Sequence, residues 1–296
     1  MKSEILFKPG NRWRQRFLKA FLLVCLAGFV GLAFAQVWSR RRSAVSAGPI
    51  DRGGVPTWPL PERFEQDVFT FARLKYTSSR PERSSYAWFT DYPDADLNLS
   101  YRLQQLSSLR VHPEPKVLEI ADPELFSFPW VFMSGAGNIT LTDEEAATLR
   151  KYLLNGGAMM VDDFWGQREW DGVFLAMKKI FPDRQIVDVP RSHQIFHFLF
   201  DLPDSLSLQT SNLRSAVSNQ GTGVTWEDNH LGGNTREIHF RAIFDDKDRI
   251  MVFLCHNTDN GDGWEEEGSD PWFFREFSEK KNYPLGFNII FYLMTH

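Results

Sequence analysis

The chain of 296 residues contains only two cysteines, Cys25 and Cys255, and this scarcity excludes several kinds of site. Cys25 lies in an apolar N-terminal stretch, so the remaining chain holds a single cysteine and cannot form an internal disulfide. No C-x-x-C pair is present, which argues against a zinc ribbon or a thioredoxin-like redox site. The sequence therefore predicts no cofactor and no metal site.

Basic side chains are also scarce outside the N-terminus. The first 43 residues hold nine Lys or Arg and one Glu, which leaves 24 basic and 37 acidic side chains, a formal net charge of −13, for the rest of the chain. Because an acidic surface repels phosphate groups, nucleic acid is excluded as a partner.

The N-terminus contains the parts of an export signal. Basic residues precede the apolar stretch Ala20–Ala35, which ends in an A-x-A site, as in a secretory signal peptide. An uncleaved membrane anchor is the alternative, because residues 20–38 are about long enough to span a bilayer. Since more positive charge precedes the stretch than follows it, the domain is predicted outside the cytoplasm in both cases. We therefore predict residues 1–38 as signal peptide or inner-membrane anchor of a periplasmic or otherwise extracytoplasmic protein of the cell envelope.

Residues 39–63 are rich in Pro, Gly and Ser and are predicted to be a linker, which leaves residues 64–296 as the domain. Its centre is the stretch Pro129–Gly166. Two short apolar runs, Trp130–Met133 and Ala158–Val161, flank a helical pattern that begins with the capping box of Thr142 and Glu145 and ends at Asn155-Gly156-Gly157. Strand, helix and strand in this order form the right-handed crossover of a parallel sheet.

Polar residues follow both strands of this unit. Ligands bind beyond the carboxyl ends of parallel strands, so one shared edge should carry them. The predicted ligand-binding residues there are Ser134, Gly135, Asn138, Asp162 and Trp165. Asp163 is a candidate metal ligand or general base, but Asp162 or Asp163 capping the next helix is an equally ordinary role.

Several segments resemble a known family, namely Phe71–Tyr76, Thr90–Pro93, Leu141–Trp165 and His256–Asp259 with Gly261–Trp264. Together they are similar to the bacterial family called domain of unknown function 4159, over about residues 66–296. That family is similar in fold to class I glutamine amidotransferases and to the trehalose-utilisation protein A group. The resemblance thus implies an α/β, flavodoxin-like, largely parallel sheet flanked by helices, and it implies no established activity.

One departure from the amidotransferases concerns chemistry. They carry a cysteine nucleophile in the turn after a strand, where this chain reads Val161-Asp162-Asp163-Phe164-Trp165. Cys255 lies in a different predicted strand, so glutamine hydrolysis by a thiolate is not expected.

The C-terminal third adds two groups of candidates. His193 and His197 have i, i+4 spacing, but no H-E-x-x-H motif completes a zinc site. The acidic, Gly-rich stretch after the predicted strand Arg249–Leu254 contributes His256, Asn257, Asp259 and Trp264. It is predicted to be a solvated loop; if it binds a cation, Asp259, Asp262 and Glu265 are the oxygen donors.

Two functions follow from these residues. The first is a binding module for a polar ligand, such as a saccharide, or for a partner protein, because no nucleophile with an adjacent base is visible. The second is a hydrolase of a saccharide or another polar substrate in which Asp163, His193 and His256 converge.

Overall fold

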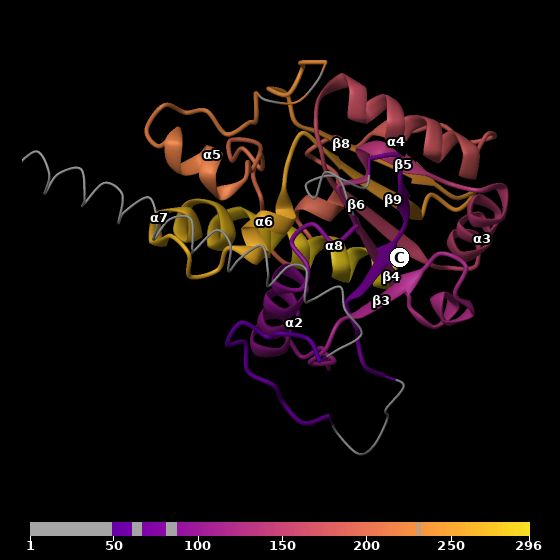
Figure 1. Ribbon diagram of the computed structural model, residues 1–296, viewed down its shortest axis with the longest axis horizontal. Helices are drawn as coiled ribbons and strands as arrows, with labels where there is room; N and C mark the ends of the chain where they lie inside the picture. The colour runs from indigo at the N-terminus through magenta and orange to yellow at the C-terminus, as the bar shows by residue number, and fades with distance from the viewer. Residues whose placement is uncertain (1–48, 61–66, 81–87, 229, 231) are drawn as a thin grey trace, which may run out of the picture. The chain divides into compact units, whose positions relative to one another are not determined.

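A seven-stranded, mostly parallel sheet forms the centre of the computed structural model, which describes residues 49–60, 67–80, 88–228, 230 and 232–296 (Figure 1). In sheet order its strands are β3 (Lys116–Glu119), β1 (Ala72–Lys75), β4 (Trp130–Ser134), β6 (Ala158–Phe164), β9 (Ile250–His256), β8 (His239–Phe244) and β7 (Val187–Asp188). Strand β8 runs antiparallel to both of its neighbours, and the other pairs are parallel. A separate two-stranded sheet joins β2 (Thr77–Ser78) and β5 (Ile139–Thr140).

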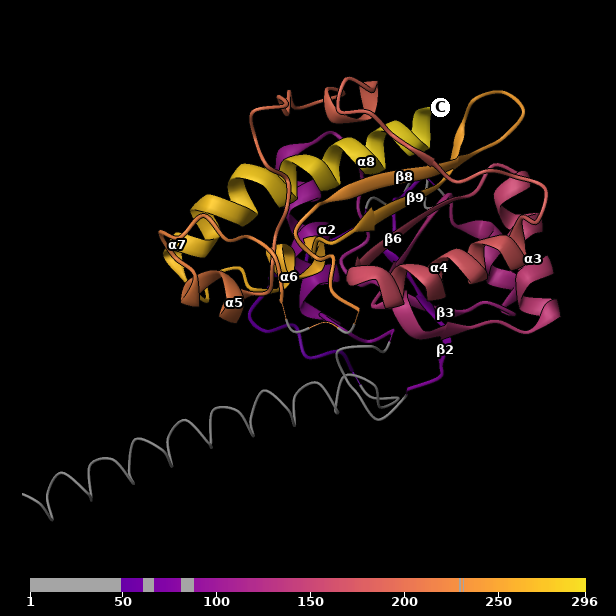
Figure 2. The ribbon, with the colours of Figure 1, turned by 90° about the horizontal axis from the view of Figure 1, so that it is seen from above.

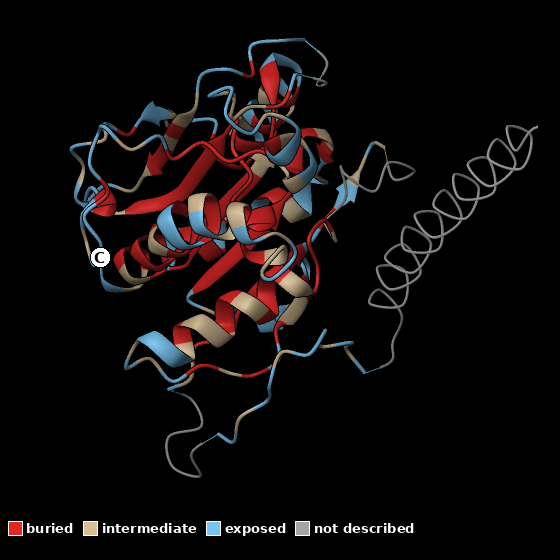
Figure 3. Cartoon of the chain, turned by 90° about the vertical axis from the view of Figure 1, so that its left-hand side faces the viewer, coloured by how far each residue is buried: buried red, intermediate tan, exposed pale blue. Residues whose placement is uncertain are grey.

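Helices cover both faces of the large sheet (Figure 2). One face packs against α2 (Asp94–Leu106), α6 (Asn260–Glu265) and α8 (Tyr283–Thr295), and the other against α3 (Asp143–Leu154) and α4 (Gly166–Ile180). The remaining helical segments are η2 (Pro123–Ser127), η3 (Ala136–Asn138), η4 (Gln194–Phe196), α5 (Leu213–Ser218), α7 (Pro271–Phe273) and the π-helical η5 (Phe274–Asn282). The central strands β4, β6 and β9 are buried between these layers, whereas the outer helix faces are exposed (Figure 3).

The apolar runs explain this arrangement. Side chains alternate along each strand, so Trp130 and Phe132 of β4 join the core under α2 and α8, whereas Val131 and Met133 join the core under α3 and α4. The capping box of Thr142 and Glu145 starts α3 as the sequence predicts. The largely parallel α/β fold, the central crossover unit and the terminal helix are thereby confirmed.

Part of the predicted linker contacts the domain. Residues Arg52–His296 form one unit, and the side chain of Trp58 stacks on Tyr101 and donates to the carbonyl oxygen of Val111 at 2.7 Å. Residues 52–58 are therefore anchored to the domain. The predicted signal peptide or anchor lies outside the described residues. No helix within the described ranges has the length and apolarity needed to span a bilayer.

Candidate functional site

The carboxyl ends of β4, β6 and β9 meet at one edge of the sheet, here called the rim. Ser134 pairs in register with Asp162, and Phe164 pairs with His256. The segments Ser134–Asn138, Asp162–Trp165 and His256–Asp262 therefore lie side by side, as parallel strands require.

Asp163 is the second-last residue of β6, where the chain begins to turn toward α4. Its φ of 52° is left-handed, and the register between β6 and β9 shifts at this point. The turn separates the two neighbouring carboxylates: Asp162 stays on the α6 side of the sheet, while Asp163 accepts a hydrogen bond from the indole nitrogen of Trp165 at 3.0 Å.

Asp162 has a structural role. Its carboxylate accepts hydrogen bonds from the backbone and side-chain nitrogens of Asn260 and from the backbone nitrogen of Gly261, at 2.8 to 3.0 Å. Burial raises the pKa of Asp162 to about 7, although these hydrogen bonds favour the ionised form. The residue joins β6 to the first turn of α6 rather than facing a ligand.

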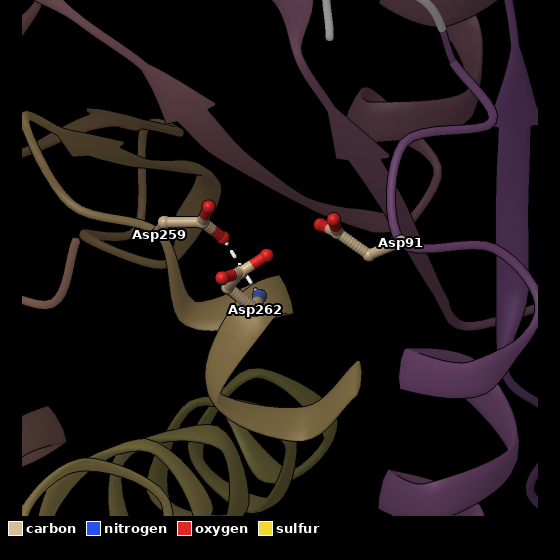
Figure 4. A group of neighbouring side chains, drawn as sticks. All are labelled: Asp91, Asp259 and Asp262. Atoms are coloured by element: carbon tan, nitrogen blue, oxygen red, sulfur yellow. Dashed lines mark hydrogen bonds between the residues drawn. The ribbon is translucent and has the colours of Figure 1, made fainter. Parts of the chain in front are cut away.

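Three further carboxylates gather beside it, from Asp91, Asp259 and Asp262 (Figure 4). One oxygen of each lies within 4.8 Å of the others, and the residues are 1%, 4% and 7% exposed. The close approach of Asp91 depends on Gly261, since a methyl group there would lie 2.2 Å from Asp91 Oδ2. Asp259 and Asp262 are oxygen donors that the sequence predicts, and Asp91 is the third member here. The third predicted donor, Glu265, lies in a second group with Asp262 and Glu266.

The predicted solvated loop is wrong for this region. Asp259 caps α6 by accepting the backbone N–H of Asp262 at 2.8 Å, and residues 260–264 are buried. Asp262 in turn accepts the backbone N–H of Leu213 at 2.6 Å. The acidic stretch is therefore a short helix packed onto the sheet end, with its carboxylates turned inward.

Burial and nearby acidic side chains raise the pKa of the carboxylates at the rim. Desolvation, followed by the charges of neighbouring acids, raises the pKa of Asp163, Asp259 and Asp262 well above the ordinary value. Among the ion pairs within the described ranges, none joins one of these three to Lys or Arg. Buried carboxylates without a basic partner are costly unless a cation or a hydrogen-bond donor neutralises them.

Two buried hydroxyl groups belong to chain segments that adjoin the rim. Ser134 shares the face of β4 that also carries Phe132 toward α2 and α8, and Ser211 directly precedes the segment that donates to Glu227 and Asp262. Both residues are fully buried, and neither hydroxyl has a hydrogen-bond partner in the described part of the chain. Polar atoms so placed favour a polar ligand at the rim.

A histidine that the sequence did not single out completes the site. His230 lies 2.9 Å from Glu227 Oε2 and 3.3 Å from Glu169 Oε1, and its ring stacks on Trp165. Burial opposes its protonation, but the hydrogen bonds and charges of both glutamates outweigh burial and raise the pKa of His230 to about 10. Glu169 also accepts the backbone N–H of Trp165 at 2.7 Å, so this group fixes the turn after Asp163.

The raised pKa of His230 makes stability fall as the solution becomes alkaline. The folded state retains the proton up to about pH 10, whereas an unfolded histidine releases it near pH 6.5, so this contribution is complete below pH 6.5 and is lost toward pH 10. Between about pH 6.5 and pH 8 we expect the free energy of unfolding to fall by about 2 kcal/mol more in the wild type than in His230→Gln. Urea titrations of the wild type and His230→Gln at both pH values measure this difference in the free energy of unfolding. An equal decrease in the free energy of unfolding of both proteins would refute the raised pKa of His230. His112→Gln serves as the control.

His256 does not provide a free base. Its Nδ1 is 3.0 Å from Arg241 Nη1, its Nε2 is 3.2 Å from the carbonyl oxygen of Gly166, and its ring stacks on Phe164 and Trp170. Burial, followed by the charge of Arg241, lowers the pKa of His256 to about 3. Both nitrogens are engaged, so the residue is neutral and structural.

His193 lies at the opposite end of the sheet. Its ring contacts Phe244 and Tyr292, and Phe244 pairs with Ile250, the first residue of β9, whereas His256 is the last. Six residues of strand separate the two ends by about 20 Å. The predicted convergence of Asp163, His193 and His256 is therefore wrong.

The other predicted residues mostly build the rim. Gly135 donates its N–H to the carbonyl oxygen of Asp162, Asn138 accepts the N–H of Ser79 through its carbonyl, and the Asn257 side chain binds the backbone of Gly166. Trp264 is fully buried against Phe132 and donates to the carbonyl oxygen of Asn282, so it belongs to the core and offers no ligand surface.

Comparison with known proteins agrees with the resemblance seen in the sequence. A family model described as a domain of unknown function, DUF4159, matches residues 70–294. None of the curated proteins matches the chain.

Proposed function

The chain belongs to the DUF4159 family, whose description names no activity, and we propose that it is an extracytoplasmic binding module that holds a divalent cation at the rim and, through it, a polar ligand. The observation that carries the proposal is the convergence of the buried Asp91, Asp259 and Asp262 carboxylates at the rim. Export follows from the N-terminal segment predicted above.

The donor set favours a hard cation. Carboxylate oxygens are the ligands that Ca²⁺ and Mg²⁺ prefer, and Cys and His, which favour softer metals, are not among the three residues. Three side chains supply only part of the six to eight oxygens that Ca²⁺ takes, so positions remain for hydroxyl or carboxylate oxygens of a ligand. A bound cation would also offset the cost of burying these carboxylates and the smaller repulsion among them.

Calorimetric titration of the full-length chain with calcium, magnesium and manganese chloride tests this function. We expect binding by the wild type and at least about 30-fold weaker binding by Asp91→Asn, because Asn tolerates the left-handed φ of 63° but lacks the charge. Asp248→Asn is the matched control, since Asp248 is an exposed aspartate with φ of 60° in the β8–β9 turn. Absence of heat with all three metals, or equal affinities in Asp91→Asn and the wild type, would refute the proposal.

A further inference from the structure

A second polar concavity lies outside the carboxylate cluster. It is a groove of about 290 Å³ between the loop at residues 219–225 and the π-helical η5, and this volume lies at the lower end of the range for ligand pockets. Its lining includes Ser207, Asn219, Thr225, Trp272, Lys280 and Lys281. Segments distant in sequence thus bring hydroxyl groups, an amide, an indole ring and two ammonium groups to one place.

Lys281 is the unusual member of the lining. It is only 7% exposed, its Nζ donates to the carbonyl oxygen of Gln209 at 3.2 Å, and the same atom lies 4.4 Å from the centre of the Phe277 ring. An ammonium group has three donors, and this carbonyl uses one of them. Within the described residues no carboxylate forms an ion pair with Lys281, whereas Lys280 beside it pairs with Glu276 at 3.2 Å.

Electrostatics agree with this geometry. Burial, followed by the charge of Lys280, lowers the pKa of Lys281 to about 8, so the free protein holds this proton weakly. An anion beside Nζ would restore the charged form. Glu276 also lines the groove, so two ammonium groups and one carboxylate leave one net positive charge there, which suits a carboxylate better than a doubly charged phosphate.

We infer that this groove binds a saccharide carrying a carboxylate, such as a uronic acid, with the carboxylate at Lys281 and the sugar ring against Trp272. An indole ring presents an apolar face with a polar edge, which matches the face and rim of a pyranose ring. Asn219, Thr225 and Ser207 supply donors and acceptors for sugar hydroxyls. This site is separate from the cation site, and its failure would leave the proposed function at the rim untouched.

Gln209 connects the groove to the rim. Its carbonyl oxygen receives the Lys281 ammonium, while its side-chain amide donates to the carbonyl oxygens of Thr235 and Asn257 at 3.1 and 3.0 Å. Its side-chain oxygen accepts the hydroxyl of Thr225, a member of the groove lining. The floor of the groove is therefore held by the same segment that follows β9, which keeps Lys281 in place without a ligand.

Calorimetric titration of the full-length chain with trigalacturonate tests the inference. We expect the acidic trisaccharide to bind at least about ten-fold more tightly than the neutral galactose trisaccharide of the same linkage. Lys281→Met keeps the side-chain length without the charge and should weaken binding by roughly 30-fold or more. Lys247→Met, in the exposed β8–β9 turn, should bind like the wild type.

A second measurement needs no variant. In the wild type, trigalacturonate should protect Lys281 from acylation by acetic anhydride, as read by peptide mass spectrometry, while Lys247 stays reactive. Unchanged acylation of Lys281, equal binding of both trisaccharides, or wild-type affinity in a folded Lys281→Met would each overturn the inference. Inorganic sulfate that binds as tightly as trigalacturonate would overturn the assignment to a saccharide.

Discussion

Replacing Asp96 by Ala is expected to lower the free energy of unfolding by about 3–5 kcal/mol, because it leaves the guanidinium of Arg73 buried without its counter-charge. Both side chains are fully buried. Arg73 Nε lies 3.0 and 2.9 Å from the two carboxylate oxygens of Asp96, and Nη2 bonds one of them as well. The pair joins β1 to the first turn of α2.

Urea unfolding of the wild type and Asp96→Ala measures this loss. The matched control is an exposed ion pair of the same strand: Lys75 of β1 pairs with Glu119 of β3 at 2.7 Å, and their side chains are 45% and 67% exposed. Glu119→Ala should therefore cost less than about 1 kcal/mol. If Asp96→Ala costs no more than Glu119→Ala, the buried pair does not stabilise the fold. Adding Arg73→Met to Asp96→Ala should recover part of the loss, since it removes the unpaired charge.

The same variant should weaken cation binding at the rim. Arg73 also donates to the carbonyl oxygens of Trp88 and Thr90, at 3.0 and 2.8 Å, and thereby holds the loop that presents Asp91. Asp96→Ala removes the carboxylate that fixes the orientation of this guanidinium, so its hydrogen bonds to the loop should weaken. The buried ion pair thus links the stability of the sheet edge to the geometry of the proposed site.

Local signals in the sequence predict much of this fold. The capping box of Thr142 and the glycines after Leu154 define α3, and the apolar runs on either side are too short for helices. Both features act within a few residues, so the central unit can be read without tertiary information. The two-residue strands β2 and β5 lack such a signal, because their pairing depends on chain segments about 60 residues apart.

The sequence predicts a solvated loop for the acidic stretch, and this prediction is wrong for a physical reason. Gly261 and Gly263 have low helix propensity and alternate with polar residues, which is typical of a loop. In the structure both serve close packing: a methyl group on Gly261 would meet Asp91, and one on Gly263 would lie 2.3 Å from the Asn282 side chain. Tertiary contacts therefore override the local preference, and α6 forms where propensity predicts none.

Only part of the candidate site can be predicted from the sequence, for a related reason. The sequence predicts the positions of Asp162, Asp163 and Asp259 because these residues lie at or just after the ends of strands. Asp91 and His230 come from distant loops and belong to no recognisable motif. The sequence predicts His193 at the rim, and this is wrong because the chain reverses its direction after β7. Val189 donates to the carbonyl oxygen of Phe240, whereas His193 lies beside Phe244, at the other end of β8. The sequence contains no signal for this reversal, so the rule that residues after a strand lie at the rim fails for His193.

Asp259→Asn should have opposite effects on stability in the absence and presence of calcium. Burial and the charges of neighbouring acids raise the pKa of Asp259, so the folded state favours the protonated form and ionisation near neutral pH costs stability. The neutral Asn should therefore raise the free energy of unfolding of the metal-free chain at pH 8, and it retains the capping oxygen for the N–H of Asp262.

With calcium at about 100 times the dissociation constant, the wild type should gain about 2.7 kcal/mol through binding, and Asp259→Asn should gain almost nothing. Thermal unfolding at pH 8, with chelator and with calcium, measures both effects, and Asp248→Asn should follow the wild type in both. A metal-free Asp259→Asn that is less stable than the wild type, yet is still stabilised by calcium, would mean that Asp259 only caps α6. The order of stability should instead reverse when calcium is added, because the charge that destabilises the empty rim is the charge that binds the cation.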